Sequence, residues 1–157
     1  MITVSVDSKS VLARLDAMPD RVRAELRKKV TDLALKLEAK VKRKVSGEVL
    51  NVRSGDLRRS IFNDVSEADA SVIGRVYSSG DVKYAAIHEY GGRTPPHVIE
   101  AKGNALAFLM GGKMVFAKRV NHPGSRIPER SYVRSSLEEM AGQIEQGLRD
   151  AVIEGLK

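Results

Sequence analysis

Apolar residues recur every three or four positions along two long stretches of the chain. In the first stretch, which follows Pro19 and stops at Ser46-Gly47, they are Val22, Leu26, Val30, Leu33, Leu37, Val41 and Val45. In the second stretch they are Val133, Leu137, Met140, Ile144, Leu148 and Val152. This spacing is typical of an amphipathic helix, and glycine commonly ends one. The pattern therefore predicts a long helix over 19–46 and an amphipathic helix at the C-terminal end.

Alternating and β-branched runs predict strands elsewhere. Period-two alternation over 2–6 indicates a short strand, and a short helix through Ala17 would follow it. The β-rich runs 57–65 and 71–78 suit a hairpin or meander. Residues 84–90 would form two helical turns that Gly91-Gly92 ends. The remaining segments are expected to be loops, at 48–56, 94–96 and 121–130.

The clearest strand signal is "ALAFLMGGKMVFAKRV", residues 105–120, in which two glycines suit a tight turn between two strands. In that register Phe108 faces Val115 on one side of the hairpin and Leu109 faces Met114 on the other. Both faces are then apolar, whereas an antiparallel sheet with one face in water alternates apolar and polar residues. Two helices of the same chain or a neighbouring subunit would have to cover these faces, and the sequence leaves both alternatives open.

Together these elements predict an α+β fold in a single domain, 1–157: a small antiparallel sheet packed with one long basic helix and a C-terminal amphipathic helix. A length of 157 residues, with 42% hydrophobic and 30% charged side chains, is in the range of one soluble domain. No apolar run approaches the roughly 20 residues that span a bilayer. The first ten residues lack the features of a signal peptide, so we expect assembly in a cytoplasm and no membrane partner.

The net charge of +7 is concentrated in the long helix, where ten basic residues against four acidic ones give +6. The C-terminal segment 129–157 has six acidic residues against four basic ones, which gives −2. Segments of opposite charge would attract each other within or between subunits. The basic face is either solvated or in contact with a nucleic acid or a partner. The side chains that would face DNA are Lys28, Lys29, Lys36, Lys40 and Arg43.

His88-Glu89 is the strongest candidate for chemistry, because H-E-x-x-H on a helix supplies two zinc ligands and a general base. Position 92 is Gly92, so the second ligand is missing. The chain has no cysteine and only three histidines, which lack metal-site spacing. No G-x-S-x-G elbow and no phosphate-binding loop motif is present. We therefore expect no catalytic residue, no metal and no cofactor; a hydrolase using His88 and Glu89 is the enzyme hypothesis to be tested.

Several motifs in a fixed order carry a resemblance to a known family. After the long helix come "RSGDLRRSI" (53–61), "YAAIHEYGG" (84–92), the His-Pro-Gly turn at 122–124 and an aromatic start to the last helix at Tyr132. In this order the chain resembles the tail-completion and head–tail joining proteins of tailed phages and prophages, which include relatives of minor tail protein Z. The family often has Arg-Pro-Phe-Leu where this chain has Arg130-Ser131-Tyr132-Val133. That departure affects where the last helix begins.

The resemblance implies a structural virion protein without catalytic activity. Its subunits would form a homo-oligomeric ring, a hexamer if it matches tail symmetry, at the neck or head-proximal tail end. The ring would join the tail terminator or tail tube to the head connector, and passing genomic DNA would make at most nonspecific contact with it. The alternative is a nonspecific DNA-binding protein that uses the basic helix 19–46.

Residues expected at an oligomer or partner interface come from these motifs. They are Arg58, Arg59, Tyr84, His88, Glu89, Tyr90, His122, Arg130, Tyr132 and Arg134. Within "YAAIHEYGG" we expect Tyr84 and Ile87 to anchor a short helix. Glu89 is expected to bond locally or across a subunit boundary, and His88 to form a hydrogen bond at the helix end.

Overall fold

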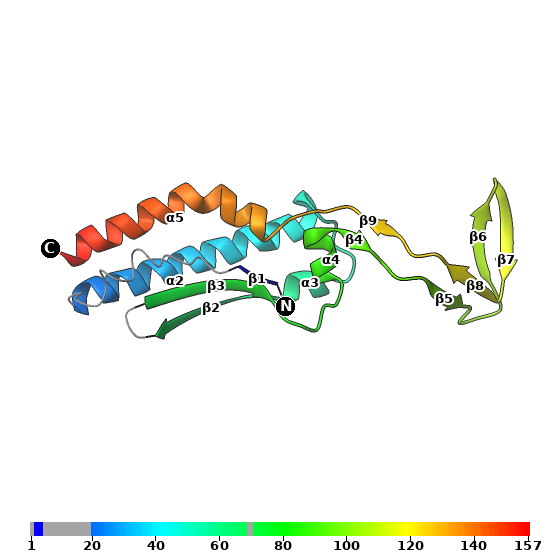
Figure 1. Cartoon of the computed structure of the whole chain (residues 1–157), viewed down its shortest axis with the longest axis horizontal. Coiled ribbons are helices and arrows are strands. Elements are labelled where there is room, and N and C mark those ends of the chain that lie inside the picture. Colours follow the sequence, from blue (N-terminus) through cyan, green and yellow to red (C-terminus); the bar gives the residue numbers. More distant parts are fainter. Residues whose placement is uncertain (1, 5–19, 69–70) are drawn as a thin grey trace.

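The structure, a computed structural model, describes residues 2–4, 20–68 and 71–157. These residues form a body of three layers and an arm that projects from one end of it (Figure 1). In the body the long helix α2 lies between the C-terminal helix α5 on one side and a small sheet on the other. This arrangement confirms the predicted α+β class. The expected helix before Pro19 lies outside the described residues.

Helix α2 spans Asp20–Arg43 and continues into a wider turn, η1, at Lys44–Glu48. The residues of α2 that are buried are Val22, Leu33, Ala34, Leu37 and Val41, which follow the predicted apolar stripe. Helix α5 spans Arg134–Gly155. It therefore begins two residues after Tyr132, which is fully buried in the core.

The sheet contains β1 (Ile2–Val4), β2 (Ile61–Ala68) and β3 (Ser71–Ser78) in the order β1-β3-β2, with every pair antiparallel. The prediction of a strand from residue 57 was wrong, because the short helix α3 occupies Asp56–Arg59. A backbone bond of 2.9 Å from Ser60 N to the Asp56 carbonyl closes this helical turn. Asp56 and Arg59 also form an exposed ion pair across this turn.

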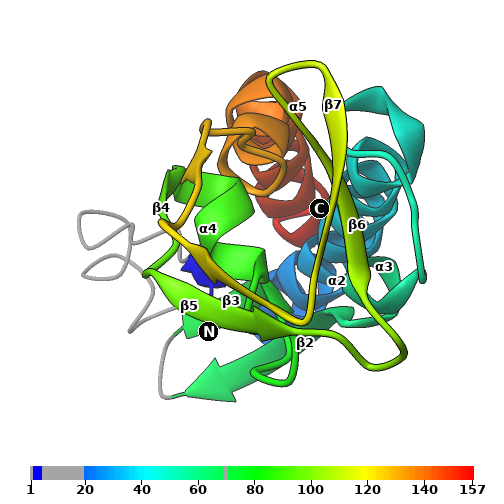
Figure 2. The same cartoon turned by 90° about the vertical axis from the view of Figure 1, so that its right-hand side faces the viewer.

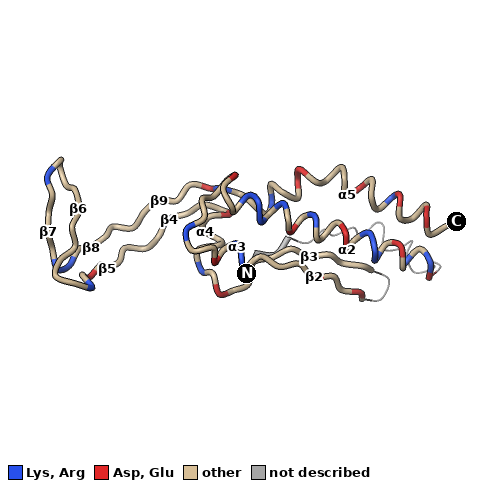
Figure 3. The backbone as a smooth tube through the Cα atoms, turned by 180° about the vertical axis from the view of Figure 1, so that it is seen from behind, with Lys and Arg blue, Asp and Glu red and all other residues tan. Residues whose placement is uncertain are grey.

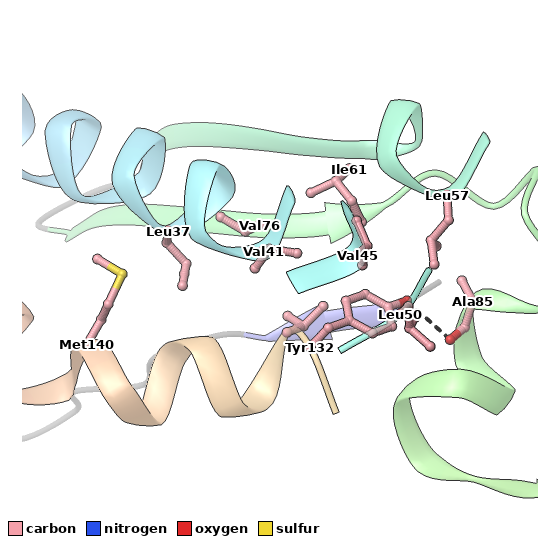
Figure 4. Packing of buried hydrophobic residues seen from close by; sticks show 11 residues of the cluster. Leu37, Val41, Val45, Leu50, Leu57, Ile61, Val76, Ala85, Tyr132 and Met140 are labelled. Carbon is pink, nitrogen blue, oxygen red and sulfur yellow. Dashed lines mark hydrogen bonds between the residues drawn. The ribbon is translucent and has the colours of Figure 1, made fainter. Parts of the chain in front are cut away.

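The core lies where α2, the start of α5 and the sheet meet (Figure 4). Its fully buried side chains include Val41, Ile61, Val76 and Tyr132. Leu57 of α3 and Ala85 of the next helix close the end of the core that faces the arm. The base of the arm is therefore continuous with the main apolar core.

The arm follows α4 (Ala85–Tyr90) and comprises residues 92–127. It is a ladder of three short antiparallel pairs: Gly92–Arg93 (β4) with Arg126–Ile127 (β9), His97–Glu100 (β5) with Arg119–His122 (β8), and Leu106–Met110 (β6) with Lys113–Ala117 (β7). The expectation of a loop over 121–130 was therefore wrong in part. Prolines at 95, 96 and 123 interrupt the ladder, because proline donates no backbone hydrogen bond, and so the flanking strands are very short.

The hairpin β6–β7 has the predicted register, with Phe108 opposite Val115 and Leu109 opposite Met114. Seen from its own end of the molecule, it lies across the far end of the arm, in front of the body (Figure 2). Neither α2 nor α5 reaches it. Of the two alternatives for its apolar faces, cover by helices of the same chain does not occur within the described residues. Cover by a neighbouring subunit stays a prediction.

Candidate functional site

Glu89 lies at the centre of the joint between body and arm. Its side chain is 0% exposed, and its carboxylate faces the start of α5. Oε2 accepts hydrogen bonds from the backbone N–H groups of Tyr132 (2.8 Å) and Val133 (3.0 Å). Oε1 accepts from the Ser131 hydroxyl (2.8 Å) and from the Arg134 N–H (2.9 Å). The first N–H groups of a helix have no partner within it, so this carboxylate caps α5 from a distant part of the chain.

Two further bonds hold α4 against the segment before α5. The Tyr132 hydroxyl donates to the Ala85 carbonyl at 3.1 Å, and Arg130 N donates to the His88 carbonyl at 2.8 Å. Burial, and after it the nearby Glu89 charge, raises the pKa of Tyr132 far above its usual range. The anchors of the short helix are therefore Ala85 and Glu89. The expected anchor Tyr84 is instead 43% exposed.

Gly91 permits the close approach that this joint requires. Its φ is +69°, and a Cβ there would lie 2.8 Å from Glu129 N. Any side chain would push α4 away from the segment that leads into α5. "YAAIHEYGG" thus forms a docking segment whose partner, "ERSYVR", lies about forty residues later in the chain.

This geometry bears on the hypothesis of a His-Glu hydrolase. A carboxylate has about four lone-pair sites, and Glu89 already accepts four hydrogen bonds in a buried position. It has no free acceptor for a substrate proton. His88 Nδ1 is buried without a hydrogen-bond partner among the described residues, so the expected histidine bond at the helix end is absent there. The pair supplies no arrangement that general acid–base chemistry would need.

Beside the joint is an open pocket of about 530 Å³, which we call the arginine pocket. Arg53, Arg58 and Arg130 line it together with Tyr84 and His88, and its lining contains no acidic residue. None of the three arginines forms an ion pair within the described part of the chain. Burial, and then the positive charge of Arg130, lowers the pKa of His88. Such a pocket can hold a carboxylate or a phosphate group.

The other predicted interface residues do not line the arginine pocket. Arg59 pairs with Asp56 on α3, and Arg134 pairs with Glu129 while its guanidinium lies 5.8 Å from the centre of the Tyr90 ring. His122 is far out on the arm, where its ring stacks on His97 at 4.9 Å between centroids. The structure therefore brings together the residues of the joint and of the arginine pocket, but not His122.

The residues expected to face DNA are largely engaged with other parts of the chain. Lys36 pairs with Asp32 at 2.7 Å, and Lys28 lies 3.7 Å from Glu25. Arg43 lies 3.8 Å from Glu48. The stem of Lys29 lies against α5 near Gly147.

Lys40 binds Glu139 of α5 at 2.7 Å, and the buried Lys44 binds the same carboxylate at 2.5 Å. Hydrogen bonds from these two lysines lower the pKa of Glu139 to about 2. The expected attraction between the basic and acidic helices thus occurs within one chain.

The interface residues proposed from the sequence did not include the tip of the arm, which the structure makes prominent. Leu109 is 71% exposed and Phe116 is 69% exposed, and Met110 and Met114 beside them are also exposed. The sequence did contain a signal for this interface, because both faces of the hairpin are apolar. Which residues remain uncovered depends on how far the arm projects, and no local pattern specifies that distance.

Comparisons with protein-family models, with curated proteins and with solved structures gave no match. Within the described residues, no helix combines the length and the apolar character needed to cross a bilayer. In the same part of the chain, no three histidine, aspartate or glutamate side chains are grouped as a metal site would require.

Proposed function

We propose that the chain is a structural virion protein, a neck or tail-completion subunit whose copies form a ring between the head-proximal end of a phage tail and the head connector. The observation that carries the proposal is the arm. It presents a hairpin of large apolar side chains, Leu109, Met110, Met114 and Phe116, far from the core of its own body. Leu109, Met114 and Phe116 share one face of the hairpin, and a contiguous apolar surface of this kind marks a contact with another molecule.

The construction of the joint also supports an assembly role. Burying a carboxylate is unfavourable unless it is fully hydrogen-bonded, and Glu89 meets that condition with four donors from the start of α5. The bonds fix the position from which the arm leaves the body. A fixed arm with an apolar tip suits a subunit that must reach a neighbour in a defined direction. The ordered motifs that resemble tail-completion proteins point to the same role.

The test uses the phage or prophage that carries this gene. Deleting the gene should yield separate heads and tails in electron micrographs, and the wild-type gene supplied in trans should restore joined particles. A variant with Leu109→Ser and Phe116→Ser should fold but fail to restore them. The exposed α2 variant Thr31→Ala serves as the control and should restore them fully. Normal infectious particles from the deletion strain would refute the proposal.

The alternative, a nonspecific DNA-binding protein, has less support from the geometry. The ion pairs of Lys36, Lys40 and Arg43 reduce the charge that the long helix can offer to phosphates. The alternative predicts duplex binding whose affinity falls steeply with salt concentration. Binding that persists at physiological salt and is lost on replacing these three residues by glutamine would favour it over the structural role.

A further inference from the structure

The arm and the helix α5 carry opposite charge. Residues 92–127 contain six basic side chains and one acidic side chain, a net charge of +5. Residues 134–157 contain five acidic and three basic side chains, a net charge of −2, and Glu154 near the C-terminal end pairs with Lys157 at 2.7 Å. Figure 3 shows these charges on the two elements, with lysine and arginine around the hairpin and mostly acidic positions along α5. Complementary potentials of this kind guide the pairing of protein surfaces.

The two elements also carry matching apolar groups. The tip of the arm exposes Leu109 and Phe116, and the C-terminal end of α5 exposes Ile153 (58%) and Leu156 (67%). On α5 these apolar side chains stand beside the exposed Asp150 and Glu154. On the hairpin Lys118 follows Phe116 on the same face, and Lys113 lies at the turn next to Met114. Each surface thus has an apolar centre with charge at its margin, which is the usual composition of an interface.

The two surfaces cannot meet within one molecule. The tip of the arm and the C-terminal end of α5 lie at opposite ends of the long axis, with the whole body between them (Figure 1). A contact between them therefore requires two copies of the chain. Because the two surfaces differ, the contact is heterologous, and its repetition produces a closed ring or an open filament.

We propose that the arm of one copy binds α5 of a second copy, with Leu109 and Phe116 packed on Ile153 and Leu156. The inference rests on the proposed assembly function and names the contact that builds the ring. Contact between two tips is disfavoured, because it would bring two arms of charge +5 together. Contact between arm and α5 instead pairs basic with acidic side chains around the apolar centre.

Cysteine cross-linking tests this contact directly, because the chain contains no cysteine of its own. Phe116→Cys is made in one copy of the chain and Ile153→Cys in a second copy of different mass. The two variants are mixed at rising concentration and oxidised. We expect the mixed disulfide between the two copies to predominate. The control replaces Ile153→Cys by Thr31→Cys on the exposed side of α2, and its mixed disulfide should be at least tenfold less abundant.

Three results would overturn the proposal. The first is a predominant disulfide between two Phe116→Cys copies, which would indicate contact between two tips. The second is equal cross-linking to Ile153→Cys and Thr31→Cys, or no cross-linking to either at any concentration. The third is binding of the tip to vesicles of anionic phospholipid with no cross-link to α5, which would assign the hairpin to a lipid surface. Because this test uses the purified chain, its failure would leave the head–tail joining phenotype to be judged separately.

A charge exchange tests the electrostatic part. Lys113→Glu with Lys118→Glu should weaken association at least tenfold, as should Asp150→Lys with Glu154→Lys. Mixing the two double variants should restore much of the loss, because opposite charges again face each other. Lys83→Glu, an exposed change outside both surfaces, is the control and should have little effect. Failure of the mixed variants to recover would contradict pairing between these two surfaces.

Discussion

Replacing Glu89 by alanine should destabilise the whole body, although residue 89 belongs to a helix of only six residues. The substitution removes the acceptor of four hydrogen bonds at the start of α5. Two of the donors, Tyr132 N and Val133 N, are fully buried and have no alternative partner in the chain that the structure describes. The other two, the Ser131 hydroxyl and Arg134 N, are partly buried and can recover some hydration.

The magnitude follows from the burial of these donors. A buried donor without an acceptor costs about 1–3 kcal/mol. With about 1.5 kcal/mol for each buried donor and about 0.5 kcal/mol for each partly buried one, the loss is about 4 kcal/mol. Deleting the carboxylate also removes the cost of burying its charge, so we expect a net loss of about 3 kcal/mol. For a chain of this length that corresponds to a fall in Tm of roughly 6–12 °C.

Thermal and urea unfolding followed by circular dichroism measure this loss. Glu138→Ala, an exposed carboxylate on α5, is the matched control and should change the free energy of unfolding by less than about 0.5 kcal/mol. Glu89→Gln separates hydrogen bonding from volume. Its amide oxygen can keep both buried N–H bonds, and the Ser131 hydroxyl can turn to accept from the amide NH₂, so only the Arg134 N–H loses its acceptor. We expect Gln to cost about 0.5 kcal/mol, the value of that one partly buried donor and well below the loss for Ala; a loss below 1 kcal/mol for Ala would refute the reasoning.

Three further predictions concern other contacts. The pKa of Glu139 is about 2, below its ordinary value of 4.5, so the stability that it contributes is fully present above pH 4.5 and is lost as the pH falls towards 2. Urea unfolding of Glu139→Gln should therefore show a smaller fall in the free energy of unfolding over that range than the unchanged chain. Gly124→Ala should open the base of the arm, because its Cβ would lie 2.1 Å from the Thr94 carbonyl oxygen; amide exchange should rise there, whereas Gly111→Ala, with open space around it, should affect only its own turn. Tyr132→Phe should lower the free energy of unfolding by about 1 kcal/mol through loss of the bond to the Ala85 carbonyl. Denaturant unfolding measures this loss, and an unchanged free energy of unfolding would contradict the prediction.

The body of the fold could be predicted from the sequence because its signals are local. The apolar stripe of α2 and the two glycines of the β6–β7 turn each specify an element through neighbours only a few residues apart. The helical turn at Asp56–Arg59 was missed, since its β-rich surroundings continue into β2 and its own signal is a single ion pair between residues three apart. Short elements of this kind depend on contacts more than on pattern.

The candidate site could be predicted only in part, because its central contact joins distant segments. The sequence singled out Glu89 and Tyr132 separately and placed both at an interface. It could not indicate that Glu89 caps α5, the helix that Tyr132 precedes, since no spacing rule relates positions 43 residues apart. Likewise the apolar faces of the hairpin were visible in the sequence. Their exposure depends on proline breaks and on the joint, which together hold the arm away from the body.

Helix α5 has a different contact at each of its ends. Its N-terminal end is fixed by Glu89, which lies three residues before the first arm residue, so the direction of the arm and the position of α5 are set by the same carboxylate. Its middle is fixed to α2 through Glu139 and the lysines at 40 and 44. Under the proposed contact its C-terminal end receives the arm of a neighbour. In each copy α5 would then connect that copy's own arm, at its N-terminal end, with the arm of the neighbour, at its C-terminal end. The geometry of a ring would therefore depend on how firmly Glu89 holds the joint.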